Sequence, residues 1–128
     1  MRAAIPHILV VDDNEAILES VAMVLRWNAL RVSTSVKMDN FTTSVRELDP
    51  DLILLDKMLG WADGCDLCIG LKKDVSTQNI SIIMLSAFHN LKDSCLSAGA
   101  DAFLEKPFDI NELLRLVHTY TTPVLLPS

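Results

Sequence analysis

The sequence predicts an α/β protein built on a doubly wound, five-stranded parallel sheet flanked by five helices. Three short runs are almost wholly apolar and end in polar residues: Ile8–Val11, Leu52–Leu55 and Ile80–Leu85. Such runs are typical of strands that are covered on both faces, as in a parallel sheet. Amphipathic helical patterns alternate with the runs, and this alternation implies right-handed crossovers between parallel strands.

Two weaker strands and the helices complete the predicted sheet. Leu30–Ser33 alternates apolar and polar side chains, which indicates a half-exposed edge strand, and Ala102–Leu104 is a short fifth run. The first and last helices each show a clear apolar stripe. The first stripe consists of Ile17, Val21, Val24 and Leu25, and the last of Ile110, Leu113, Leu114 and Val117. The patterns around 41–48 and 67–71 are weaker, and Gly99 is a candidate helix terminator. Periodicity alone leaves the strand order open.

The chain is long enough for one well-packed domain and too short for two. We therefore expect a single domain over residues 1–128, with a core at about 7–120 and a short, Pro-punctuated tail at 121–128. Half of the residues are hydrophobic and 22% are charged, which is typical of a globular protein and excludes a disordered one.

Charge and hydropathy exclude several classes of partner. The net charge is -6 and the longest run of basic residues is Lys72-Lys73, so we expect no direct binding to nucleic acid. No apolar stretch approaches the roughly 18 residues of a membrane helix, and Met1 to His7 lacks the apolar segment of a signal peptide. We expect a cytoplasmic protein without a membrane contact. Its three cysteines are then expected to be reduced thiols.

Polar residues end each apolar run and should meet at one edge of the sheet. They are Asp12, Asp13, Asp56, Ser86 and Lys106. In doubly wound sheets, ligands bind beyond the carboxyl ends of the strands. Three neighbouring carboxylates repel one another unless a cation neutralises them, and hard oxygen ligands favour Mg²⁺, with Mn²⁺ as the alternative ion. A carboxylate can also attack phosphorus to form an acyl phosphate, which makes Asp56 the candidate nucleophile. Lys106 and the Ser86 hydroxyl would then bind the phosphoryl oxygens.

Four segments carry a family resemblance, which extends from about His7 to Tyr120. They are Val10-Val11-Asp12-Asp13-Asn14-Glu15, Leu54-Leu55-Asp56, Met84-Leu85-Ser86-Ala87 and Leu104-Glu105-Lys106-Pro107-Phe108. Their order and spacing resemble the response-regulator receiver domains of two-component signalling, in the single-domain form of chemotaxis regulators. The resemblance implies a flavodoxin-like fold with strand order 2-1-3-4-5.

The resemblance also implies a role for each site residue. Asp56 would be the phosphoacceptor, and Asp12, Asp13, Asp56 and the backbone carbonyl of Met58 would hold the metal. Ser86 and Phe103 would form the switch, Lys106 would bind the phosphoryl group, and the Lys106-Pro107 peptide bond would be cis. The loop 56–64 departs from the family at Leu59 and Gly60, where Met and Pro are frequent, while Asp63-Gly64 matches.

The implied function is Mg²⁺-dependent acceptance of a phosphoryl group from a sensor histidine kinase or a phosphotransfer protein. Output would go to a downstream protein through the face of the fourth helix, fifth strand and fifth helix, with a phosphorylation-dependent dimer through that face as a further expectation. The chain would not be an enzyme beyond its own phosphorylation and dephosphorylation. The alternative is a degenerate receiver that acts as a phosphorylation-independent interaction module.

Simpler interpretations exist for several of these residues. Asp12 and Asp13 could merely cap a helix. Cys65 and Cys68 have the spacing of a redox or zinc half-motif, but the sequence shows no second ligand pair, so helix packing is favoured. Trp61 is either packed over the site or a surface aromatic. A dehalogenase-like phosphatase would need an Asp where Met58 stands, and the acidic residues after the first strand would repel a flavin phosphate.

Overall fold

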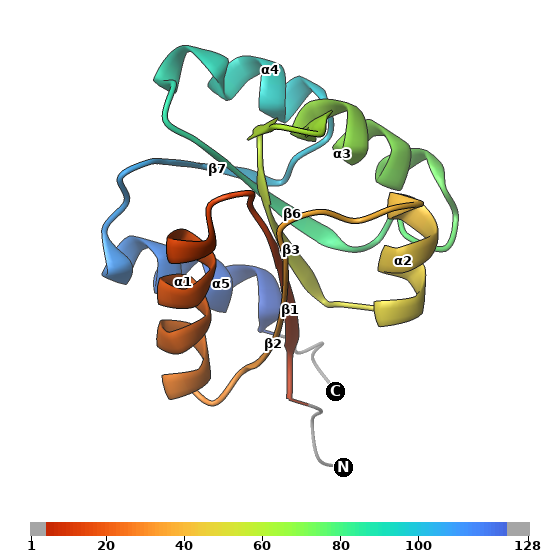
Figure 1. The fold of residues 1–128 in the computed structure, drawn as a ribbon. Helices are drawn as coiled ribbons and strands as arrows, with labels where there is room; N and C mark the ends of the chain where they lie inside the picture. The colour runs from red at the N-terminus through yellow and green to blue at the C-terminus, as the bar shows by residue number, and fades with distance from the viewer. Residues whose placement is uncertain (1–4, 123–128) are drawn as a thin grey trace, which may run out of the picture.

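The computed structural model describes residues 5–122, which form a three-layered α/β domain (Figure 1). The central sheet contains β1 (His7–Val11), β2 (Arg31–Ser35), β3 (Leu52–Asp56), β6 (Ser81–Ser86) and β7 (Ala102–Glu105). Its order is β2-β1-β3-β6-β7 and all neighbouring strands are parallel. Two short strands, β4 (Met58–Leu59) and β5 (Ala62–Asp63), lie outside this sheet. Without them the order is 2-1-3-4-5, so the expected fold is confirmed.

Five α-helices cover the two faces of the sheet. They are α1 (Glu15–Trp27), α2 (Phe41–Leu48), α3 (Gly64–Lys73), α4 (Lys92–Ser97) and α5 (Ile110–Thr121), and a 3₁₀ turn at His89–Leu91 precedes α4. One apolar cluster joins the sheet to α1 and α5, and the other joins it to α2, α3 and α4. The helices group in the same way in Figure 1. In the described part of the chain, no helix has the length and apolar character needed to cross a membrane.

The apolar runs became strands because both of their faces are covered. All residues of Ile8–Val11 and Leu52–Leu55 are fully buried, and so are Ile82 to Leu85. Burial of a Val, Leu or Ile side chain stabilises the fold by about 1.5–3 kcal/mol. The core therefore lies along the middle of the sheet and holds the carboxyl ends of β1, β3 and β6 in fixed register.

The structure corrects several predicted boundaries. The edge strand was expected at Leu30–Ser33 but spans Arg31–Ser35, where it pairs with the whole of β1. The last helix continues to Thr121, the first residue of the expected tail, and residues 123–128 lie outside the described part. Gly99 follows the end of α4 with a φ of 105°, a conformation that glycine adopts without strain.

The segment after β3, expected as a loop, contains a small antiparallel hairpin of β4 (Met58–Leu59) and β5 (Ala62–Asp63). Gly60 lies at its turn, and the Gly60 N–H donates to Asp13 Oδ2 over 3.1 Å. A proline at position 60, frequent in the family, would lack this donor. The departure at Gly60 therefore adds a hydrogen bond between the hairpin and the acidic edge of the sheet.

Candidate functional site

Three carboxylates gather where β1 and β3 end. Asp12 follows β1 directly, Asp13 is next in the chain, and Asp56 is the last residue of β3. One oxygen from each carboxylate lies within 4.8 Å of the others. Asp12 is fully buried, Asp56 is almost buried and Asp13 is exposed, so the cluster opens to solvent on one side.

Lys106 supplies the positive charge of this cluster. It follows β7, and its Nζ lies 2.5 Å from Asp12 Oδ2 and 3.4 Å from Asp56 Oδ2. The Lys106-Pro107 bond is cis, as expected. One ammonium group against three carboxylates leaves two negative charges uncompensated. The oxygen-only donor set and this excess charge suit a divalent cation such as Mg²⁺.

Backbone groups orient the carboxylates. Asp12 Oδ1 accepts a hydrogen bond from the Asn14 N–H over 2.9 Å, and Asp56 Oδ1 accepts one from the Met58 N–H over 3.3 Å. Asn14, rather than Asp12 or Asp13, caps α1 by accepting from the Ile17 N–H. Neither aspartate is the N-cap of α1, although Asp12 accepts a backbone N–H at the start of this helix.

Burial raises the pKa of the Asp56 carboxyl above its usual value of 3.8, against the opposing effect of Lys106 and with a further increase from the Asp12 charge. Because the pKa of Asp56 is higher in the folded than in the unfolded chain, ionisation of this carboxyl lowers the stability of the fold at neutral pH. We expect metal-free Asp56→Asn to be more stable than the parent at pH 7, and the gain to shrink as the pH falls through the raised pKa towards 3.8. Urea unfolding in EDTA across this pH range measures the effect. A gain independent of pH would contradict it.

Ser86 lies farther along the same edge, and Phe103 lies two residues before the end of the neighbouring strand β7. Ser86 ends β6, is 1% exposed, and its Oγ accepts a hydrogen bond from the Phe88 N–H over 3.0 Å. Phe103 pairs with Met84 in the register of β6 and β7, and packs partly buried against the cluster under α2, α3 and α4. Because side chains alternate along a strand, Ser86 and Phe103 point to the same face of the sheet.

Met58 is exposed on β4 beside the acidic cluster. It lines a hollow of about 520 Å³ together with Asp13, Lys57, Gly60 and other residues of the hairpin. Its place next to Asp56 suits the predicted ligand role of its carbonyl oxygen, and that role stays a prediction.

Sequence reasoning missed an ion pair next to Asp56. Lys57 Nζ lies 2.8 Å from Asp63 Oδ2, and this contact raises the pKa of Lys57 and lowers that of Asp63. Asp63 also caps α3 by accepting from the Cys65 N–H over 2.8 Å. The pair thus links the end of β3 to the start of α3. The five residues between Lys57 and Asp63 show no periodic pattern that could have predicted the pair.

Trp61 packs partly buried against the core rather than standing as a free surface aromatic. Its Nε1–H donates to the Val36 carbonyl over 2.8 Å, and its ring lies tilted against Phe41 with 6.3 Å between centroids. Cys68 is buried in the core, as helix packing predicted, and all three cysteines are free thiols.

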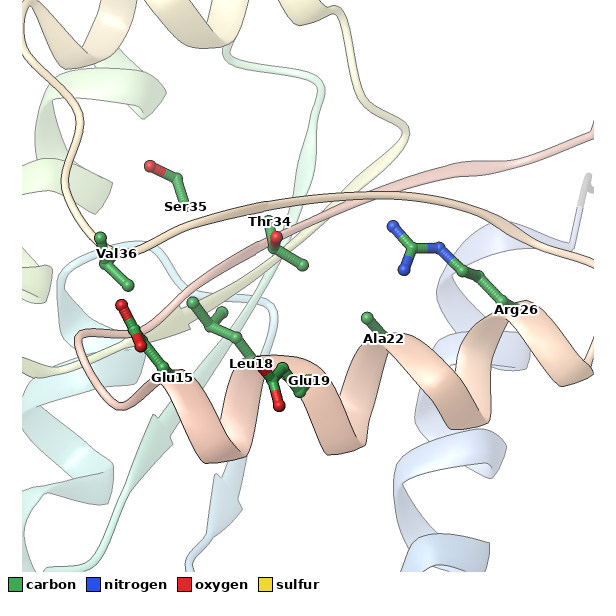
Figure 2. A pocket seen from close by; sticks show the side chains of 8 residues that line it. All are labelled: Glu15, Leu18, Glu19, Ala22, Arg26, Thr34, Ser35 and Val36. Atoms are coloured by element: carbon green, nitrogen blue, oxygen red, sulfur yellow. The ribbon is translucent and has the colours of Figure 1, made fainter.

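A second groove, also of about 520 Å³, lies between α1 and β2 (Figure 2). Figure 2 shows Glu15 and Arg26 toward its two ends, with Leu18 and Ala22 of α1 between them. Arg26 is held by its hydrogen bond to the Val32 carbonyl, and the carboxylates of Glu15 and Glu19 would repel a phosphoryl group.

Comparison with known proteins shows a family match over most of the chain. Residues 8–118 match the response regulator receiver domain family. The chain is 37% identical over 114 residues to the DNA-binding dual master transcriptional regulator RpaA of Synechocystis, covering 88% of this chain and 47% of that protein. It is 37% identical over 113 residues to the phosphate regulon transcriptional regulatory protein PhoB of Escherichia coli, covering 87% of this chain and 49% of that protein. The chain thus spans about half the length of these relatives.

Solved structures agree with the sequence relatives. The receiver domain of sensor histidine kinase PA1611 from Pseudomonas aeruginosa, which has a magnesium ion in its active-site cleft, superposes with a TM-score of 0.81 at 28% identity, covering 91% of this chain and 98% of that one. The receiver domain of NtrX from Brucella abortus superposes with a TM-score of 0.81 at 28% sequence identity. The match covers 91% of this chain and 99% of that one. Fold, acidic edge and sequence match lead to one conclusion: the chain belongs to the response regulator receiver domain family.

Proposed function

We propose that this receiver domain accepts a phosphoryl group on Asp56 from a histidine kinase or a phosphotransfer protein, in the presence of Mg²⁺. The observation that carries the proposal is the position of Lys106 Nζ, 3.4 Å from Asp56 and 2.5 Å from Asp12, at an edge where Asp13 adds a third carboxylate. A degenerate interaction module would have no need to keep Asp12 and Asp56 buried together with a single ammonium group, because buried like charges destabilise a fold.

In the proposed reaction, a carboxylate oxygen of Asp56 attacks the phosphorus of the donor's phosphohistidine. A P–O bond forms, the P–N bond breaks, and the histidine ring leaves with the electron pair. Lys106 neutralises the charge of the transferred group, and the hydroxyl of Ser86 donates a hydrogen bond to one of its oxygens. Asp12, Asp13 and Asp56 would hold Mg²⁺, which supplies charge neutralisation to the equatorial oxygens, and the magnesium-containing cleft of the PA1611 receiver supports this assignment. The reaction would be confined to the domain's own phosphorylation and dephosphorylation.

Output would follow from a shift between two conformations of the face formed by α4, β7 and α5. Ser86 Oγ accepts from the Phe88 N–H, and its hydroxyl proton would turn toward a phosphoryl group on the neighbouring strand. Phe103 is half-buried on the same side of the sheet and next to Met84, so it can occupy the space that Ser86 vacates. The downstream partner, or a second copy of the domain, would bind the changed face.

The test is phosphorylation by a small donor. Incubation with acetyl phosphate and Mg²⁺ should add one phosphoryl group to the parent, in a peptide that contains Asp56, and none to Asp56→Asn. Excess EDTA should slow the reaction at least tenfold, as expected when charge neutralisation worth about 1.4 kcal/mol or more is removed. Intact-mass spectrometry measures the adduct. An unmodified parent, or equal adducts on parent and variant, would overturn the proposal.

The acyl phosphate should be long-lived. Met58 and Phe88, two residues beyond Asp56 and Ser86, are 55% and 52% exposed and carry no group that could orient an attacking water. Met58→Asn should therefore shorten the phosphoryl half-life by about tenfold, a modest share of the effect typical of general acid–base groups. Loss of the adduct after donor removal measures both half-lives, and equal values would contradict the explanation. Val75→Asn, at an exposed position after α3, is the matched control and should leave the half-life unchanged.

A further inference from the structure

Two cysteines from different helices meet behind the hairpin. Cys65 is the second residue of α3, Cys95 lies in α4, and their Sγ atoms are 3.8 Å apart. Cys95 is fully buried, whereas Cys65 is half-buried and reachable from solvent. Cys68, one turn further along α3, is fully buried in the core.

We propose that Cys65 and Cys95 form a site of reversible thiol oxidation, which is closed to a disulfide by exchange with a small-molecule disulfide of the glutathione type. In the first step, the Cys65 thiolate attacks one sulfur of the small disulfide, so that a mixed disulfide forms and one small thiolate leaves. In the second step, the Cys95 thiolate attacks Cys65 Sγ and releases the second small thiolate. The protein loses two protons and two electrons, and the small disulfide is reduced to two thiols.

The order of the two steps follows from access and electrostatics. Burial raises the pKa of Cys65, while the hydrogen bond with Cys95 and the charge of Lys57 oppose the increase. Burial, the Cys65 charge and the Cys65 hydrogen bond raise the pKa of Cys95 to about 12. Cys65 is therefore the thiol that reacts first. Once Cys65 carries the mixed disulfide, its charge and its hydrogen bond no longer raise the pKa of Cys95.

The geometry requires a small movement of one short element. A disulfide has an S–S length of about 2.05 Å, so the two sulfurs must approach by roughly 2 Å. Cys95 lies in a helix of six residues that follows a 3₁₀ turn, which makes α4 the element that adjusts. The cross-link would fasten α4 to the first turn of α3. That turn is joined to the site by the Asp63 cap and by the Lys57–Asp63 ion pair.

The test is incubation of the metal-free parent with oxidised glutathione at mildly alkaline pH. Intact mass should show the loss of two hydrogens without a retained glutathione, and tryptic peptides should join Cys65 to Cys95. Cys68→Ser should form the same cross-link, and so should Asp56→Asn, because the reaction does not use the acceptor carboxylate. A stable mixed disulfide on the parent, or a bond between Cys65 and Cys68, would overturn the proposal.

Two further variants separate the steps. Cys95→Ser should stop at one glutathione on Cys65, and Cys65→Ser should remain unmodified because Cys95 is buried. Far-UV circular dichroism and a thermal melt establish that each variant is folded. Rapid modification of folded Cys65→Ser would contradict the assignment of the first thiol. The peptide map of the parent needs no variant, so the proposal stays testable if a substitution destabilises the core.

Discussion

Replacement of Lys106 by methionine should lower the free energy of unfolding by about 3–5 kcal/mol in metal-free solution, as expected when one partner of a buried ion pair is removed. Lys106 is the cation between Asp12, which is fully buried, and Asp56, which is 6% exposed. Methionine keeps most of the side-chain volume but leaves both carboxylates without their ion pair. The loss is a large share of the roughly 5–15 kcal/mol that stabilises a domain of this kind.

Urea unfolding of the parent and of Lys106→Met in EDTA measures this effect. The exposed Lys73 of α3 offers a matched control, and Lys73→Met should change stability by no more than about 0.5 kcal/mol. In the double variant Asp12→Asn, Lys106→Met, much of the loss should be recovered, because one of the two unpaired carboxylates is gone. If the stability changes of Asp12→Asn and Lys106→Met simply added in the double variant, the two residues would act independently. Their 2.5 Å contact predicts that the changes do not add.

The sequence could predict the strands and the residues at their ends, because both depend on local patterns. Ile8–Val11 and Leu52–Leu55 are apolar at every position, and runs of this length are typical of strands covered on both faces. The polar residues that follow must then lie at one edge of a parallel sheet. Lys106 and Asp12 are 94 positions apart, so a prediction of their contact requires the strand order. The family resemblance implies this order, whereas periodicity leaves it open.

Short and irregular features could not be predicted in this way. The hairpin of β4 and β5 has two residues in each strand, which is too short for an alternating pattern to appear. The meeting of Cys65 with Cys95 depends on how α3 and α4 pack, and their positions along the chain do not contain that information. The spacing of Cys65 and Cys68 along the chain gives no sign of the contact between Cys65 and Cys95.

Gly64→Ala should lower the free energy of unfolding by about 3 kcal/mol, the upper part of the range for overpacking, and should slow phosphorylation of Asp56 by roughly 100-fold. A Cβ at this position would lie 2.3 Å from the Asp56 carbonyl oxygen and 2.9 Å from Lys57 Cα. Both are backbone atoms, so neither can rotate away. The Gly64 N–H also donates to the Lys57 carbonyl over 2.8 Å, which holds α3 against the end of β3. Any relief of the clash must therefore displace the acceptor carboxylate.

The other glycine of α3 provides the comparison. A Cβ at Gly70 would meet only Thr42 Oγ1, at an ordinary 3.8 Å, so Gly70→Ala should stabilise the helix by about 1 kcal/mol and leave phosphorylation unchanged. Urea unfolding and the initial rate of phosphorylation by acetyl phosphate distinguish the two substitutions. Equal stability and equal rates for both variants would mean that the contact between α3 and β3 yields without moving Asp56. A Gly64→Ala variant that is phosphorylated slowly but unfolds with the parent's free energy would show that the substitution acts by displacing Asp56. Catalysis is more sensitive than folding to small displacements of a reacting group.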